Sequence, residues 1–240
     1  MNPFKRYWST FRTKQTLRRQ SDTPRIPWVT VILSIVLILI YYWQTKDPQI
    51  TTMWSTGEIL TLLQHQYYQL ITANWIHQSW SHVLGNVFGL LLIGWRFERL
   101  IGHWRFLIIY LVAGLTSTIF SLSFHQGVLG ASGSIVGIMV AALVLYLRFF
   151  RNSLVKAFTT WWQVVVILIE ILAVGIGLFN IGYTNTNDLA HTGGIIGAVL
   201  TLWLLNPPLQ VGKYRTVTRI SAAVLLMALF GVSIAVLLNF

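Results

Sequence analysis

Several polar side chains with catalytic potential interrupt stretches of sequence that are otherwise apolar. They are Ser132, His191, the pair His82 and Asn86, and Glu170. A polar or ionisable residue is costly inside a membrane span, so each is by default a candidate functional residue. A serine becomes a nucleophile when a base such as histidine lies within hydrogen-bonding distance. His and Asn side chains can also donate hydrogen bonds to a developing oxyanion.

Each of these residues also has a purely structural interpretation. Ser132 is a suitable N-cap for a helix. Gly133 and Gly137 are four residues apart, as are Gly193 and Gly197, and this spacing is typical of close helix packing in membranes. A single His or Asn in a span often serves as a hydrogen-bonding strut. The combination favours chemistry, because alternate helices would bring a nucleophile, a base and amide donors to one depth.

The composition indicates a membrane protein. Of 240 residues, 55% are hydrophobic and only 10% are charged, against about 25% charged in soluble domains. The net charge of +11 comes from small clusters between apolar runs, which argues against a nucleic-acid-binding face. The chain has no cysteine, which excludes disulfides and Cys-based metal sites. We expect no cofactor, no metal and no nucleic acid.

Seven apolar runs approach the length of about 20 residues that a spanning helix needs. They are residues 27–44, 82–97, 104–123, 128–148, 160–180, 189–206 and 219–239. The first is too long for the apolar region of a signal peptide and ends in the aromatic residues Tyr41, Tyr42 and Trp43, so it is interpreted as a retained anchor. The fourth places Ser132 about four residues, or about 6 Å, inside a helix that opens at Val128.

The positive charges predict the orientation of these spans. Sixteen of the 17 Lys and Arg residues fall on the side of the N-terminus, and only Lys46 falls on the other. The prediction is a cytoplasmic N-terminus and an outer C-terminus. The corresponding segments are a basic tail (1–26), a six-helix core (27–206) with a long outer loop (45–81), and a linker with a seventh helix (207–240). The outer loop is either an interfacial segment or has a direct role.

The polar motifs resemble those of the rhomboid family of intramembrane serine proteases. Gly130-Ala131-Ser132-Gly133 with Gly137, and Ala190-His191-Thr192-Gly193-Gly194 with Gly197, are similar to its two signature motifs, and His82 with Asn86 matches its H-x-x-x-N motif. Further matches are Leu70-Ile71-Thr72, His77, Glu98, Gly102, Arg105, Phe106 and Tyr110. The resemblance covers residues 57–206 and implies an all-α, six-helix membrane core, to which 219–239 adds a seventh helix.

The resemblance also implies a role for each matching residue. Ser132 would be the nucleophile and His191 its general base, as a dyad. Asn86, His82 and the Ser132 backbone N–H would stabilise the oxyanion. Asp188, three residues before His191, is better interpreted as a helix N-cap than as a third catalytic acid. Because Ala131, Ser132 and His191 are all intact, an active enzyme is expected.

Two positions depart from the family pattern. Tyr68-Gln69 stands where the family often has Trp-Arg, which questions how the outer loop is anchored. Val136 stands where an aromatic residue commonly stacks on the catalytic histidine, which questions what orients His191.

These observations predict a serine endopeptidase that cleaves transmembrane proteins near the outer membrane boundary. Its partners would be those substrates and membrane lipid, in a bacterial plasma membrane. The main alternative is a non-proteolytic scaffold of the same fold that binds single-span partners. A small-molecule transporter would also use intramembrane His and Glu, but no inverted repeat is visible. Glu170 is interpreted as a protonated, hydrogen-bonded residue or as a gating residue.

Overall fold

A computed structural model describes residues 26–57, 65–150, 188–207 and 214–238, and in this part of the chain all regular structure is helical. The long helices are α2 (Trp28–Lys46), α5 (Trp80–Ile101), α6 (His103–Leu122), α7 (Ser132–Phe150), α9 (Asp188–Leu205) and α10 (Thr216–Leu238). The short helices are α3 (Gln49–Trp54) and α4 (Gln69–Thr72), both within the outer loop. The expected all-α fold is confirmed.

Six of the seven predicted spans correspond to these long helices. Four of them, α2, α6, α9 and α10, are long and apolar enough to cross a membrane by length and composition. The other two long helices are not among these four. α5 carries the charged residues Arg96, Glu98 and Arg99 near its end, and the apolar part of α7 is shorter. The chain is therefore a polytopic helical membrane protein. The predicted span 160–180, with Glu170, lies outside the described residues.

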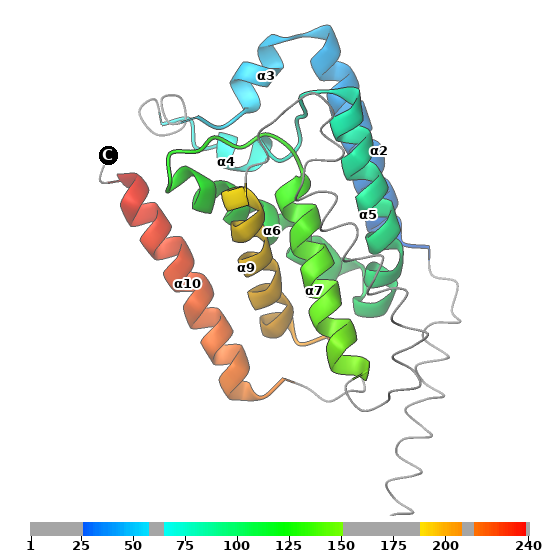
Figure 1. Cartoon of the computed structure of the whole chain (residues 1–240), viewed down its shortest axis with the longest axis vertical. Coiled ribbons are helices and arrows are strands. Elements are labelled where there is room, and N and C mark those ends of the chain that lie inside the picture. Colours follow the sequence, from blue (N-terminus) through cyan, green and yellow to red (C-terminus); the bar gives the residue numbers. More distant parts are fainter. Residues whose placement is uncertain (1–25, 58–64, 151–187, 208–213, 239–240) are drawn as a thin grey trace, which may run out of the picture.

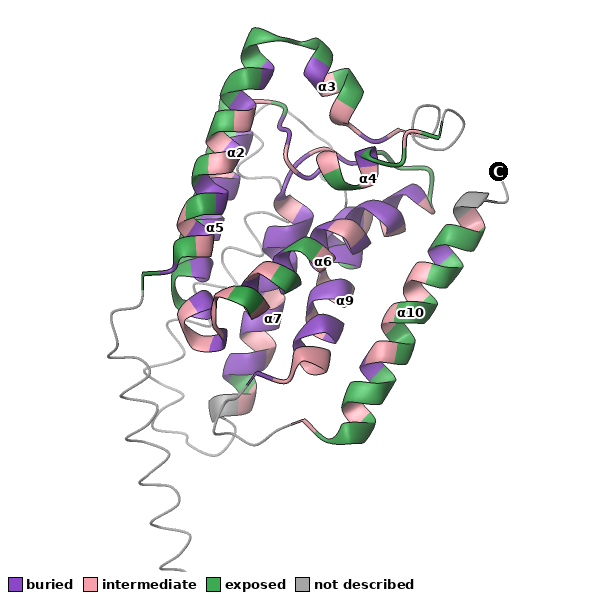
Figure 2. Cartoon of the chain, turned by 180° about the vertical axis from the view of Figure 1, so that it is seen from behind, coloured by how far each residue is buried: buried purple, intermediate pink, exposed green. Residues whose placement is uncertain are grey.

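The helices alternate in direction, so that α5, α7 and α9 all begin at the end of the molecule where α3 and α4 lie (Figure 1). α2 packs along α5, whereas α9 packs against α6, α7 and α10. Buried residues concentrate on the central helices, and α10 at the edge is largely exposed (Figure 2). Exposed apolar side chains on α2 and α10, such as Leu39 and Met227, are the surface that lipid would cover.

α7 begins at Ser132, so the prediction that this helix opens at Val128 and holds Ser132 four residues deep was wrong. Residues 127–130 are non-helical, and Gly130 has a φ of +118°, a conformation that favours glycine. The apolar Val128 and Leu129 extended the predicted span. Val128 is nevertheless buried, with 5% of its surface exposed, although it is not part of a helix.

Gln69 anchors the outer loop. Its side chain is fully buried, and its amide Nε2 donates hydrogen bonds to the Met53 carbonyl and to Gln66 Oε1, both at 3.0 Å. It thereby links α4 to the end of α3. The neighbouring Tyr68 is exposed. An uncharged amide at this position can therefore tie the loop together.

α7 and α9 approach until their backbones touch. A Cβ added to Gly194 would lie 2.1 Å from the Gly133 carbonyl oxygen, and one added to Gly137 would lie 2.6 Å from the Gly194 carbonyl oxygen. No other side chain fits at Gly194 without a shift of a helix backbone. The predicted packing role of these glycines is therefore confirmed.

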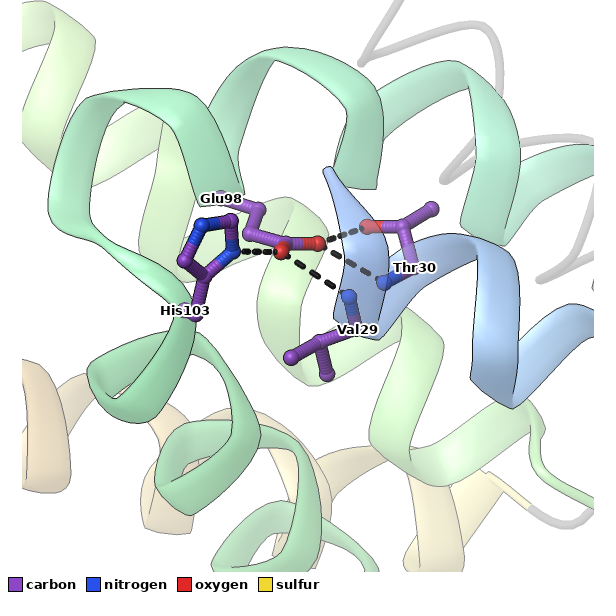
Figure 3. Close-up of polar contacts among 4 residues, drawn as sticks. All are labelled: Val29, Thr30, Glu98 and His103. Carbon is purple, nitrogen blue, oxygen red and sulfur yellow. Dashed lines mark hydrogen bonds and ion pairs between the residues drawn. The ribbon is translucent and has the colours of Figure 1, made fainter. Parts of the chain in front are cut away.

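Glu98 joins α2, α5 and α6 at the end of the core away from α3 and α4 (Figure 3). Its fully buried carboxylate accepts hydrogen bonds from the backbone N–H groups of Val29 (3.0 Å) and Thr30 (2.7 Å) and from the Thr30 hydroxyl (2.6 Å). It also pairs with Nδ1 of His103, at the start of α6. The first turn of α2 has no side-chain cap of its own. Glu98 therefore satisfies N–H groups that would otherwise lack partners, and places a negative charge at the favourable end of the helix dipole.

Replacing Glu98 by leucine is expected to lower the free energy of unfolding by about 2–4 kcal/mol, because two backbone N–H groups lose a charged acceptor. Thermal unfolding in detergent, followed by circular dichroism, measures this. Asp47→Asn is the control: Asp47 also accepts a backbone N–H, from Gln49, but is exposed. Equal effects of the two substitutions would contradict the assigned role of Glu98.

Gly194→Ala is expected to destabilise the protein by about 1–3 kcal/mol, because the added methyl group meets a backbone carbonyl. Gly231→Ala on α10 is the matched control, since nothing lies within 4 Å of its added Cβ. There alanine should be neutral or stabilising by about 0.5–1 kcal/mol. The unfolding temperature should fall in Gly194→Ala and should stay the same or rise in Gly231→Ala. A tolerated Gly194→Ala would show that the helices can separate freely.

Candidate active site

Ser132 and His191 meet at the end of the molecule where α3 and α4 lie. Ser132 is the first residue of α7, and His191 lies one turn into α9. Ser132 Oγ is 3.1 Å from His191 Nε2, within hydrogen-bonding distance. Ser132 is half-buried and His191 is 9% exposed. A serine hydroxyl next to an imidazole nitrogen is the arrangement that activates a nucleophile.

The backbone contact between α7 and α9 explains this proximity. Ala190, the residue before His191, places its carbonyl oxygen 3.2 Å from where a Cβ on Gly133 would lie. Gly133 itself follows Ser132. Ser132 and His191 are thus directly adjacent to the positions where the helices touch. Val136 is buried. The contact between Gly133 of α7 and Ala190 of α9 fixes the backbone position of His191.

His82 and Asn86 lie beside Gly130, two residues before Ser132. A Cβ added to Gly130 would lie 3.0 Å from His82 Nε2 and 3.8 Å from Asn86 Nδ2. His82 is 6% exposed and Asn86 is 5% exposed. Both side chains are on one face of α5, a turn apart. The structure therefore brings Ser132, His191, His82 and Asn86 to one region, whereas Glu170 lies outside the described residues.

Asn86 has an unused donor. Its Nδ2 is buried and makes no hydrogen bond within the described residues, and the same holds for Nδ1 of His82. Buried polar groups are normally paired, so such groups need an explanation. A buried amide N–H₂ without a partner is suited to donate to an anionic oxygen.

His77 is a further residue of this region, for which the sequence provided only a flanking match to the family. Its Nε2 accepts a hydrogen bond from the backbone N–H of Ala131 at 3.5 Å. Its ring packs edge-on against that of His82, with 5.0 Å between centroids. Burial lowers the pKa of His77 well below its ordinary value, and the nearby His82 lowers it further. The imidazole is therefore neutral, as it must be for a ring nitrogen to accept.

Gln44 of α2 holds His77 in place. Its amide oxygen accepts the His77 backbone N–H at 3.0 Å, and its Nε2 donates to the His77 carbonyl at 2.7 Å. This pairing is buried and links the first long helix to the loop that precedes α5. Neither the periodicity nor the charge pattern of the sequence identifies Gln44.

Asp188 is the first described residue of α9 and lies in its first turn, and its role as an N-cap stays a prediction. An acidic residue in a first turn interacts favourably with the helix dipole. Asp188 is exposed. Among the residues that the structure describes, no group of three or more His, Asp or Glu side chains is arranged to hold a metal ion.

Comparisons with known proteins agree with the motifs. The family profile described as Rhomboid domain matches residues 64–208. "Rhomboid protease GluP" of Bacillus subtilis (strain 168) is 30% identical over 88% of this chain and 40% of its own length. "Putative rhomboid protease YdcA" of the same organism is 27% identical over 74% of this chain and 88% of its own length.

A plant relative extends the comparison. "RHOMBOID-like protein 1" of Arabidopsis thaliana is 27% identical over 70% of this chain and 43% of its own length. The chain thus spans less than half the length of GluP and of the plant relative. The profile match and the identity to GluP confirm the resemblance seen in the motifs, and the chain belongs to the rhomboid family of intramembrane serine proteases.

Proposed function

We propose that this chain is an intramembrane serine endopeptidase that uses Ser132 and His191 as a catalytic dyad. The observation that carries the proposal is the 3.1 Å contact between Ser132 Oγ and His191 Nε2. Two relatives bear the name rhomboid protease, GluP and YdcA. Ser132, His191, Asn86 and His82 all lie within residues 64–208, which the family profile matches.

The proposed reaction has two stages. Ser132 Oγ attacks the scissile carbonyl carbon while His191 Nε2 takes the hydroxyl proton. His191 then gives that proton to the leaving amine nitrogen, and an acyl-enzyme ester on Ser132 remains. In the second stage His191 takes a proton from water, the hydroxide attacks the ester, and Ser132 recovers its proton.

Asn86, His82 and the Ser132 backbone N–H are the proposed donors to the oxyanion. The unpaired Nδ2 of Asn86 supports this assignment, because a donor that has no hydrogen bond in the resting protein need not break one before it binds the oxyanion. The proximity of both side chains to Gly130 supports it as well. Gly130 without a side chain leaves room that any Cβ would fill.

We further propose that the substrates are transmembrane proteins cut near the outer membrane boundary. Ser132 is the first residue of α7 and His191 is the fourth of α9, so both are shallow in their helices. Water, which the second reaction stage consumes, is available near a membrane surface but not at its centre. The asymmetry of the positive charges makes this surface the outer one, with the N-terminus in the cytoplasm and a bacterial plasma membrane as the host.

Ser132→Ala and His191→Ala are each expected to abolish cleavage, because the nucleophile or its base is lost. The assay reconstitutes the full chain in liposomes with a panel of dye-labelled single-span peptides and detects products by gel. Ser221→Ala on the exposed start of α10 is the matched control and should cleave like the wild type. Retained proteolysis in the purified Ser132 or His191 variant would refute the dyad. Binding of the peptides without any product, by the wild type, would favour a non-proteolytic scaffold.

Asn86→Ala is expected to slow turnover by about 10²–10³, with little change in KM, because one oxyanion donor is removed. Asn86→Asp keeps the size of the side chain but replaces the donor by a negative charge, and should be at least as slow. Steady-state kinetics with the peptide that the wild type cleaves best measures both. An Asn86→Ala variant with wild-type turnover would remove Asn86 from the oxyanion site.

A further inference from the structure

The segment that leads into Ser132 is attached to the outer loop at three points. Val128 is paired with Thr56, the Gly130 N–H donates to the Ala73 carbonyl at 2.9 Å, and the Ala131 N–H donates to His77 Nε2. These contacts fall on three of the four residues before Ser132. Val128, Gly130 and Ala131 in the segment 127–131 thus hydrogen-bond to the outer loop, and the Ala131 carbonyl also accepts the Ile135 N–H of α7 at 3.1 Å.

Thr56 makes more hydrogen bonds to this segment than Ala73 or His77 does. The Val128 N–H donates to Thr56 Oγ1 at 2.6 Å, and the same hydroxyl donates to the Val128 carbonyl at 3.1 Å. The Thr56 backbone N–H also donates to that carbonyl, at 3.3 Å. Thr56 is 7% exposed. One side chain therefore satisfies both backbone polar groups of a buried residue that has no helix or strand to do so.

The contact is also tightly fitted. A Cβ added to Gly127 would lie 2.5 Å from the Thr56 carbonyl oxygen. The outer loop and the segment 127–131 thus approach each other with backbone against backbone. A shift of Val128 would be transmitted through Gly130, which lies beside His82 and Asn86, to the backbone N–H of Ser132.

We propose that Thr56 is a positioning residue for catalysis: its hydroxyl fixes segment 127–131 and so sets the geometry of Ser132 and of the oxyanion donors. The proposal rests on the proposed function, since it assigns Thr56 a role in that same reaction. Thr56 does not touch the reacting atoms. Displacements of about 1 Å at a reacting centre can slow a reaction about 10²-fold, so a loosened segment would lower turnover more than binding.

Three substitutions separate this role from general support of the loop. Thr56→Val removes the hydroxyl and keeps the shape, whereas Thr56→Ser keeps the hydroxyl. Thr72→Val is the matched control, because Thr72 Oγ1 donates to the Trp54 carbonyl at 3.0 Å within the same loop but makes no hydrogen bond with segment 127–131 among the described residues. All three are studied as the full chain in detergent.

Two measurements on the same proteins test the proposal. The first is inactivation by a fluorophosphonate probe, which resolves the maximal rate of labelling from the half-saturating concentration. Thr56→Val should lower the maximal rate about 10-fold or more with the half-saturating concentration unchanged, whereas Thr56→Ser and Thr72→Val should stay close to the wild type. The second is amide hydrogen exchange, in which peptides covering 127–131 should exchange faster in Thr56→Val alone.

Equal labelling rates in Thr56→Val and Thr72→Val would overturn the proposal, as would a Thr56→Ser variant as slow as Thr56→Val. A wild type that is not labelled at all would instead refute the proposed serine protease. In that case hydrogen exchange still decides about Thr56: unchanged exchange of 127–131 in Thr56→Val would overturn its positioning role.

Discussion

The contact between the backbones of α7 and α9, at Gly133 and Gly194, determines most of the geometry described above. Two helices with side chains at these positions would stand further apart, and Ser132 could not reach His191. In lipid, helix association gains little from the hydrophobic effect and depends on such close packing. The glycines therefore allow both the association of the helices and the 3.1 Å separation of Ser132 Oγ and His191 Nε2.

The remaining constraint is that buried backbone groups need partners. At one end of the core, Glu98 provides acceptors for the first turn of α2, which has no cap of its own. At the other end, the outer loop provides partners for the segment before Ser132, through Thr56, Ala73 and His77. Both solutions use residues far away in sequence. They fix the ends of the helices, which the glycine contacts do not hold, and in the second case they fix the segment that leads into Ser132.

The sequence predicted the parts that follow from local pattern. The lengths of the apolar runs predicted the long helices. Ser132, His191, His82 and Asn86 were selected because they are polar residues within those runs. The start of α7 was misplaced because Val128 and Leu129 are as apolar as the residues of a membrane span. Composition cannot distinguish a buried non-helical segment from the first turn of a helix. Thr56 and Gln44 left no signal, because their partners lie 72 and 33 residues away and a single polar residue in a loop or near the end of a helix has no periodicity. Gln69 shows the converse: the sequence raised the question of the loop anchor, and only the packing of its amide answers it.

The central claim is that Ser132 is an activated nucleophile whose oxyanion is received by Asn86. The most direct measurement is a structure of the full chain after reaction with a fluorophosphonate. We expect a covalent bond from Ser132 Oγ to phosphorus, lost in the His191→Ala variant, with a phosphonyl oxygen within hydrogen-bonding distance of Asn86 Nδ2 and the Ser132 backbone N–H. An adduct on another residue, or a phosphonyl oxygen directed away from Asn86, would contradict it.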